Sequence, residues 1–226
     1  MLEILVWSGL TVAVYLLFRA LYLRGPSFWT NPLLLGWLTL MAILLATKTP
    51  FQTYRDGSAP LTLLLGPSVV AFAVPIYDQR AMILRRWPIL LVAVATGSII
   101  SVTISWELAR ALMFSPELRA SLLPRSISAP FAMIVAAQIG GVPGLAATFT
   151  AITGLLGAGV AAPLSKALGI TSKFARGAML GAGAHGVGTA RAFQWGTTEG
   201  TVAATTMTLA GVANVLLAVA WTVMRR

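Results

Sequence analysis

The chain consists largely of long apolar runs, and these runs constrain its fold more than any other feature. Of its 226 residues, 58% are hydrophobic and only 10% are charged, a composition far from that of soluble domains. At roughly 20 residues per membrane-spanning helix, there is room for about eight crossings joined by short loops. The apolar runs cover approximately residues 2–23, 32–47, 61–77, 88–113, 122–139, 145–168, 174–193 and 201–224.

Each run is expected to be helical, because lipid leaves no backbone group unpaired and the runs lack the two-residue alternation of a membrane β-barrel. The predicted fold class is all-α: a polytopic transmembrane helix bundle of about eight hydrophobic segments, two or three of them broken helices. We expect residues 1–226 to form a single integral membrane domain embedded in the lipid bilayer.

The formal net charge of +10 indicates membrane topology rather than nucleic-acid binding, because Lys and Arg lie mostly between the apolar runs. With about eight spans, ten of the 16 Lys and Arg residues fall at the termini and in the even-numbered loops. This bias predicts a multi-pass protein of the cell inner (cytoplasmic) membrane with both termini in the cytoplasm. The N-terminus has no basic cluster before its apolar run, which favours a retained span over a cleaved signal peptide.

The third and fifth runs each contain a pair of prolines, which are expected to kink or break a membrane helix. In the third run, the residues that predict a break are Gly66, Pro67 and Pro75. In the fifth run, two prolines enclose an arginine and two hydroxyl groups, in the order Pro124, Arg125, Ser126, Ser128 and Pro130. A half-helix N-terminus favours an anion, and Arg125 could bind a carboxylate through two parallel hydrogen bonds. The alternatives are simple kinks without ligand contact, and an Arg125 side chain that reaches lipid headgroups.

The seventh run contains the only histidine of the chain in a glycine-rich segment. On one continuous helix, spacings of four, four, three and four would place on one face Gly177, Gly181, His185, Gly188 and Ala192. Such a face lets another helix approach closely, so tight packing is the main alternative to a ligand site. Ionisable groups inside spans are costly, and histidine titrates near physiological pH in its unperturbed state. We therefore expect His185 to have a functional role.

Other chemical signals are weak. Residues 181–186 match the G-x-G-x-x-G dinucleotide fingerprint, but the motif requires a strand before it and has no meaning inside a membrane helix. The chain has no cysteine, no zinc-binding H-E-x-x-H motif, no P-loop and no G-x-S-x-G. We therefore expect no catalytic residues, no metal, no cofactor and no enzyme activity.

The signature segments of the LrgB/CidB family resemble four stretches of this chain, and they occur in the same order. They are LLGPSVVAFAVPIY at residues 64–77, PRSISAPFAM at 124–133, GGVP at 140–143 and HGVGTARA at 185–192. The resemblance covers about residues 64–211. It differs at Gly186, where the family often has alanine, and at Ala203 and Ala204, where it often has serine.

The resemblance implies two alternative functions. Members of the family were described as antiholin-like or holin-like modulators of murein hydrolase activity, autolysis and envelope permeability, acting with a small LrgA/CidA-type membrane partner. The C-terminal half of the plastid glycolate/glycerate translocator is also similar, and some bacterial relatives are linked to pyruvate transport. These transporters imply a carrier of small monocarboxylates, with proton coupling through His185 as an extension.

We favour the carrier, because paired helix breaks with a buried arginine and histidine are not needed for oligomer assembly. The predicted substrate-binding residues are Arg125, Ser126, Ser128, His185, Thr189 and Arg191. Homo-oligomerisation through the glycine face stays open, since small residues at this spacing suit helix association between chains as well as within one.

Overall fold

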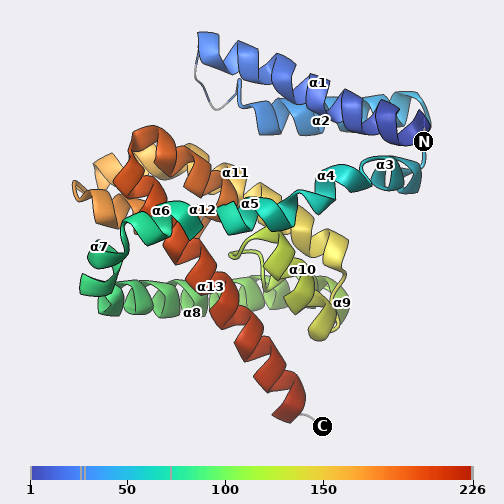
Figure 1. The fold of residues 1–226 in the computed structure, drawn as a ribbon. Helices are drawn as coiled ribbons and strands as arrows, with labels where there is room; N and C mark the ends of the chain where they lie inside the picture. The colour runs from blue at the N-terminus through green and yellow to red at the C-terminus, as the bar shows by residue number, and fades with distance from the viewer. Residues whose placement is uncertain (1, 26, 28, 72, 225–226) are drawn as a thin grey trace. The chain divides into compact units, whose positions relative to one another are not determined.

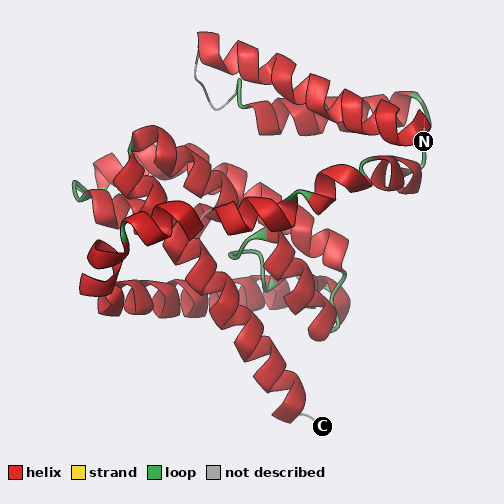
Figure 2. Ribbon diagram, in the orientation of Figure 1, coloured by secondary structure: helices red, strands yellow, loops and turns green. Residues whose placement is uncertain are grey.

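The computed structural model describes residues 2–25, 27, 29–71 and 73–224, and every regular element in these ranges is a helix (Figure 2). Four of the helices are long and apolar enough to cross a membrane: α1 over Glu3–Arg24, α8 (Trp87–Ala111), α11 (Pro143–Ala167) and α13 (Thr197–Met224). The predicted all-α transmembrane bundle is thus confirmed. The helices fall into two compact units, Met1–Ala71 and Phe72–Arg226.

The first unit is organised around a helical hairpin. Its helices are α1 (Leu2–Arg24), α2 (Pro32–Ala46), α3 (Phe51–Gly57), α4 (Ala59–Leu63) and α5 (Leu65–Ala71). Figure 1 shows α1 and α2 side by side, and α3 packs on the N-terminal half of α1. There the Trp7 and Tyr54 rings meet edge to face, with centroids 5.7 Å apart, and Ser8 Oγ donates to the Gly57 carbonyl at 2.9 Å. These contacts bury Gly57 against α1.

The third apolar run is divided into short helices, as its prolines predict. Its described residues belong to α4, α5 and α6 (Ala73–Asp78), and a turn at Leu64, three residues before Pro67, separates α4 from α5. Gly66 and Pro67 lie exposed in α5 of the first unit. Pro75 belongs to α6 in the second unit, and its side chain is not among the described parts of the structure.

The second unit contains the other long helices. It comprises α6, α7 (Arg80–Arg85), α8, α9 (Pro116–Leu122), α10 (Ala129–Gln138), α11, α12 (Lys173–Trp195) and α13. Helix α12 packs chiefly against α13 and α11, and α10 packs against the same two helices. Several of these helices have proline in their first turn, where the missing N–H has no intrahelical acceptor to lose. Pro143 begins α11 in this way, and Pro130 lies in the first turn of α10.

The glycines of α12 permit its close packing on α13. A Cβ atom at Gly177 would come within 2.8 Å of Val202 Cβ, and one at Gly181 would overlap the backbone of Ala203. Larger side chains at these two positions would therefore push the helices apart. The face predicted from the glycine spacing is buried throughout, at Gly177, Gly181, His185, Gly188 and Ala192.

Helix α12 differs from the continuous helix that the spacing predicts. At His185 the backbone has φ of 38° and ψ of −120°, which divides α12 into two helical halves. Because of this break, Gly188 packs against Leu180 and Ala184 of its own helix. A non-glycine residue with positive φ costs on the order of 1–3 kcal/mol, and such strain is concentrated at functional sites.

Candidate functional site

The first part of the site is the non-helical segment 123–128 between α9 and α10. Pro124 is buried, and the turn is closed by the Ile127 amide, which donates to the Pro124 carbonyl at 3.3 Å. Ile127 is only 1% exposed and belongs to a core cluster with Val94 of α8 and Ala210 of α13. This apolar anchor holds the polar residues on either side of it inside the second unit.

Arg125 extends from this segment toward two long helices. Its Nε donates to Ser105 Oγ of α8 at 2.8 Å, and its Nη1 donates to Thr153 Oγ1 of α11 at 3.5 Å. Ser105 is completely buried and donates its own hydroxyl to the Ser101 carbonyl at 2.7 Å. Two hydroxyl groups therefore hold the guanidinium between α8 and α11.

No carboxylate in the described ranges neutralises Arg125. The two ion pairs there are Arg55 with Asp56 and Arg110 with Glu107, both on exposed side chains. A partly buried cation without a counter-charge is costly in a low-dielectric interior. The guanidinium has five N–H groups, of which these two hydrogen bonds use only two. The arrangement is suited to binding an anion.

His185 lies next to this arginine, at the break of α12. The imidazole is 2% exposed. It interacts with the backbone of Arg125 and with the positive charge of the Arg125 side chain. Its Nδ1 faces Gly154 of α11, where an added Cβ would lie 3.3 Å away. Its Nε2 is buried with no hydrogen-bond partner in the described part of the chain. The two predicted residues of greatest chemical interest, which lie in different apolar runs, are therefore neighbours.

Further buried hydroxyl groups lack partners in the described residues. Ser128 is 7% exposed and stands at the N-cap of α10, yet its Oγ does not cap the helix. Thr150 is 3% exposed, lies one turn before Gly154 on α11, and also has an unpaired Oγ1. Buried polar atoms are normally hydrogen-bonded, so orphaned ones are candidates for contact with water or a ligand.

The other predicted site residues have different contacts. Thr189 is completely buried and its Oγ1 donates to Met207 Sδ of α13 at 3.8 Å. Arg191 Nη1 donates to Gln194 Oε1 at 2.7 Å, within the second half of α12. Ser126 is half-buried in the segment beside Arg125. The structure thus joins Arg125 and His185 directly and directs the Thr189 hydroxyl toward α13.

Sequence reasoning missed the residues that hold this pair in place. Ser105, Thr150, Thr153 and Gly154 lie in the interior of α8 and α11, which are otherwise apolar. A weak signal was present, because Ser101 and Ser105 are four residues apart and share one face of α8. In the described ranges, no three His, Asp or Glu side chains are grouped so that they could hold a metal ion.

The fold and the site define a multi-pass helical membrane protein with a partly buried arginine and a buried histidine at two helix breaks. The sequence profile of the LrgB-like family matches residues 11–223, and the chain belongs to this family.

Its relatives include uncharacterized proteins from two bacteria. YwbG of Bacillus subtilis is 36% identical over 203 residues, covering 90% of each chain. A Haemophilus influenzae protein is 34% identical over 215 residues, covering 95% of this chain and 93% of the relative. YxaC of Bacillus subtilis is 33% identical over 203 residues, covering 90% and 88%. No solved structure matches the chain.

Proposed function

We propose that this protein is a carrier of small monocarboxylates, of the pyruvate and glycolate class, and that Arg125 binds the carboxylate. The observation that carries the proposal is the Arg125 guanidinium, which two hydroxyl groups position beside His185 without a carboxylate partner in the described residues. A planar guanidinium matches a carboxylate through two parallel hydrogen bonds, and lysine cannot reproduce this geometry.

The start of α10 supports the same assignment. Ser128 is the N-cap residue of this helix, and its unpaired hydroxyl is available as a donor. Unsatisfied backbone N–H groups at a helix start carry partial positive charge, which favours an anionic group nearby. Broken membrane helices of transporters use this arrangement near the bilayer midplane to hold carboxylates. In our proposal, Arg125 and the first turn of α10 bind the substrate together.

His185 supplies the proton-coupling element of the proposal. Its unpartnered Nε2 can accept a proton, and Arg125 is the charged group that acts on it. Repulsion between an imidazolium and the guanidinium would be relieved by a bound carboxylate, so proton and substrate would bind together. The break at His185 also gives α12 a point at which its two halves could move independently.

The alternative is a modulator of murein hydrolase activity and autolysis that acts with an LrgA/CidA-type partner. Such a role needs a free face for helix association, and the glycine face of α12 was the best candidate. The face is instead covered within the chain, with Gly177 and Gly181 against α13. This favours the carrier, which we place in the cytoplasmic membrane with both termini inside the cell.

The test is uptake of labelled pyruvate and labelled glycolate into liposomes that contain the purified full-length protein. We expect saturable uptake that is faster with an inward proton gradient. Arg125→Gln should abolish it, whereas Arg110→Gln removes an exposed cation of the same unit and should leave it unchanged. Absence of saturable uptake with and without the gradient would reject the carrier. Copurification with an LrgA-type protein, together with that absence, would favour the alternative.

A further inference from the structure

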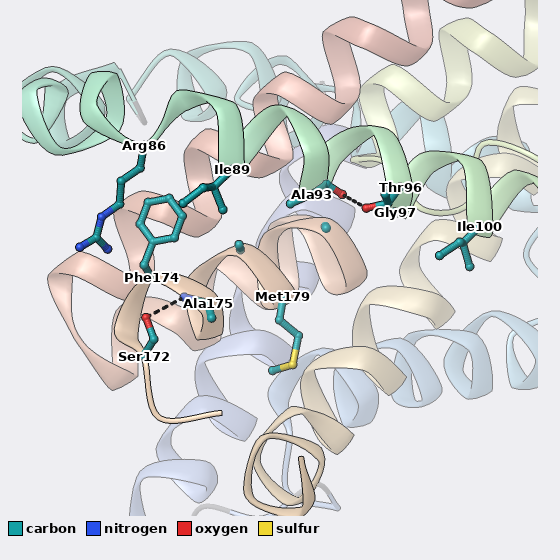
Figure 3. A pocket seen from close by; sticks show the side chains of 12 residues that line it. Arg86, Ile89, Ala93, Thr96, Gly97, Ile100, Ser172, Phe174, Ala175 and Met179 are labelled. Atoms are coloured by element: carbon teal, nitrogen blue, oxygen red, sulfur yellow. Dashed lines mark hydrogen bonds between the residues drawn. The ribbon is translucent and has the colours of Figure 1, made fainter. Parts of the chain in front are cut away.

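A cavity of the second unit lies between α8 and the first half of α12, and its lining includes neither Arg125 nor His185. Its volume is about 550 Å³, within the range of ligand-binding clefts. We call it the Arg86 groove and define it by Arg86, Ala93 and Ile100 on the α8 side and by Ser172, Phe174 and Ala182 on the α12 side. Figure 3 shows Arg86 and Phe174 at one end and Ile100 at the other.

One end of the groove is cationic and polar. The Arg86 guanidinium lies over the Phe174 ring, with Cζ 5.0 Å from the centroid, and Phe174 is itself buried. The ring holds the charge in place but does not neutralise it, and neither ion pair of the described residues involves Arg86. Ser172 Oγ accepts the Ala175 N–H at 3.4 Å, which leaves its hydroxyl hydrogen to donate to a ligand.

The remainder of the groove is apolar. Apart from Ser172, the lining contains one hydroxyl residue, Thr96. The Thr96 Oγ1 donates to the Val92 carbonyl of its own helix, α8, at 2.7 Å. Ile89 and Ile100 are 58% and 57% exposed along the groove. Small residues make the space, since even a Cβ at Gly97 would only reach ordinary contact with Ala182 Cβ at 3.7 Å. The groove is therefore suited to a ligand that is anionic at one end and hydrocarbon along its length.

The length of the groove matches one leaflet of a bilayer. Arg86 precedes α8 and Ile100 lies fourteen residues further along, which at 1.5 Å per residue corresponds to about 21 Å. Half of a bilayer, headgroups included, measures about 20–22 Å. Because α8 is one of the helices long and apolar enough to span, Arg86 at its start is suited to the headgroup level. The far end at Ile100 then falls near the midplane.

We propose that the Arg86 groove binds one phospholipid with an anionic headgroup, which Arg86 and Ser172 contact while an acyl chain lies between α8 and α12. Basic pockets between membrane helices bind anionic lipid headgroups by the same chemistry. The lipid would contact the first half of α12, which is connected to the break at His185. This site is independent of the proposed carrier activity.

The experiment is native mass spectrometry of the purified full-length protein titrated with phosphatidylglycerol or phosphatidylcholine. We expect one phosphatidylglycerol retained per chain in preference to phosphatidylcholine. Arg86→Gln should weaken retention about fivefold, the effect of losing one cation near a lipid surface. Arg85→Gln is the matched control, because this substitution removes the same positive charge at a residue that lies outside the groove lining.

The acyl-chain part is tested separately by filling the groove. Ala93→Leu should reduce retention, whereas Ala95→Leu should not, since Ala95 is exposed and lies outside the lining. Equal retention of the two lipids, or equal loss in Arg86→Gln and Arg85→Gln, would overturn the proposal. Displacement of the lipid by inorganic phosphate alone would also overturn it and would indicate a site for a free anion. A dimer that dissociates in Ala93→Leu would overturn it as well and would indicate that a second copy of the chain occupies the groove.

Discussion

His185 and Gly154 are in direct contact across the α11 and α12 interface. A Cβ at Gly154 would lie 3.3 Å from His185 Nδ1, 3.2 Å from the Ala184 carbonyl oxygen and 3.1 Å from a Val187 methyl carbon. The absence of a side chain at Gly154 is therefore what allows the imidazole to lie against α11 beside Arg125. The glycine and the histidine form one structural feature, although they belong to different apolar runs.

This contact predicts a graded response at Gly154. Gly154→Ala requires shifts of a few tenths of an ångström and should retain uptake, whereas Gly154→Leu should displace the imidazole and abolish uptake. The measurement is proteoliposome uptake together with thermal unfolding in detergent. A folded Gly154→Leu protein with normal uptake would show that the imidazole position is unimportant for transport.

The hydrogen bond from Arg125 to Ser105 predicts a change in substrate affinity. Ser105→Ala removes the 2.8 Å bond to Nε and should raise KM about tenfold, the effect expected from losing a charge-assisted hydrogen bond. Thr153→Ala removes only the 3.5 Å bond and should have a smaller effect. Equal changes of KM in the two variants would contradict the assignment of Ser105 as the main positioning residue.

The imidazole of His185 predicts a specific pH response. His185→Asn should eliminate the acceleration of uptake by an inward proton gradient, because the asparagine side chain is polar but does not titrate. Uptake driven by the substrate gradient alone should persist in this variant. The readout is the initial uptake rate at several external pH values with constant internal pH. An unchanged pH profile would remove His185 from the proton pathway.

The packing of α12 on α13 predicts different effects at two glycines, Gly181 and Gly183, that are only two residues apart. Gly181→Ala places a Cβ into the Ala203 backbone and should destabilise the protein by about 1–3 kcal/mol. Gly183 has nothing within 4 Å, so Gly183→Ala should be neutral or stabilising by about 0.5–1 kcal/mol. Thermal unfolding in detergent measures both. Comparable destabilisation of the two variants would mean that the α12 and α13 contact is looser than described.

Much of the architecture was predictable, because the residues concerned act locally. The apolar runs predicted α1, α2, α8, α11, α12 and α13 to within a few residues, and the prolines predicted the divided third run and the non-helical segment before α10. The short helices α3, α7 and α9 lie largely outside the runs and were not predicted. Predicting the break at His185 was not possible in the same way. No proline stands there, and the positive φ arises where α12 packs against α11 and α13.

The apolar runs were sufficient to predict a membrane protein, the positions of its long helices and the polar groups that those helices carry. These properties depend on hydrophobic burial and backbone pairing within each segment. The contacts of Arg125 with Ser105, Thr153 and His185 follow from the packing of the helices, because they join residues far apart in sequence. The rotation of each helix about its axis, and close approach at glycines such as Gly154, determine which side chains meet. These quantities depend on several helices together and cannot be deduced from one segment.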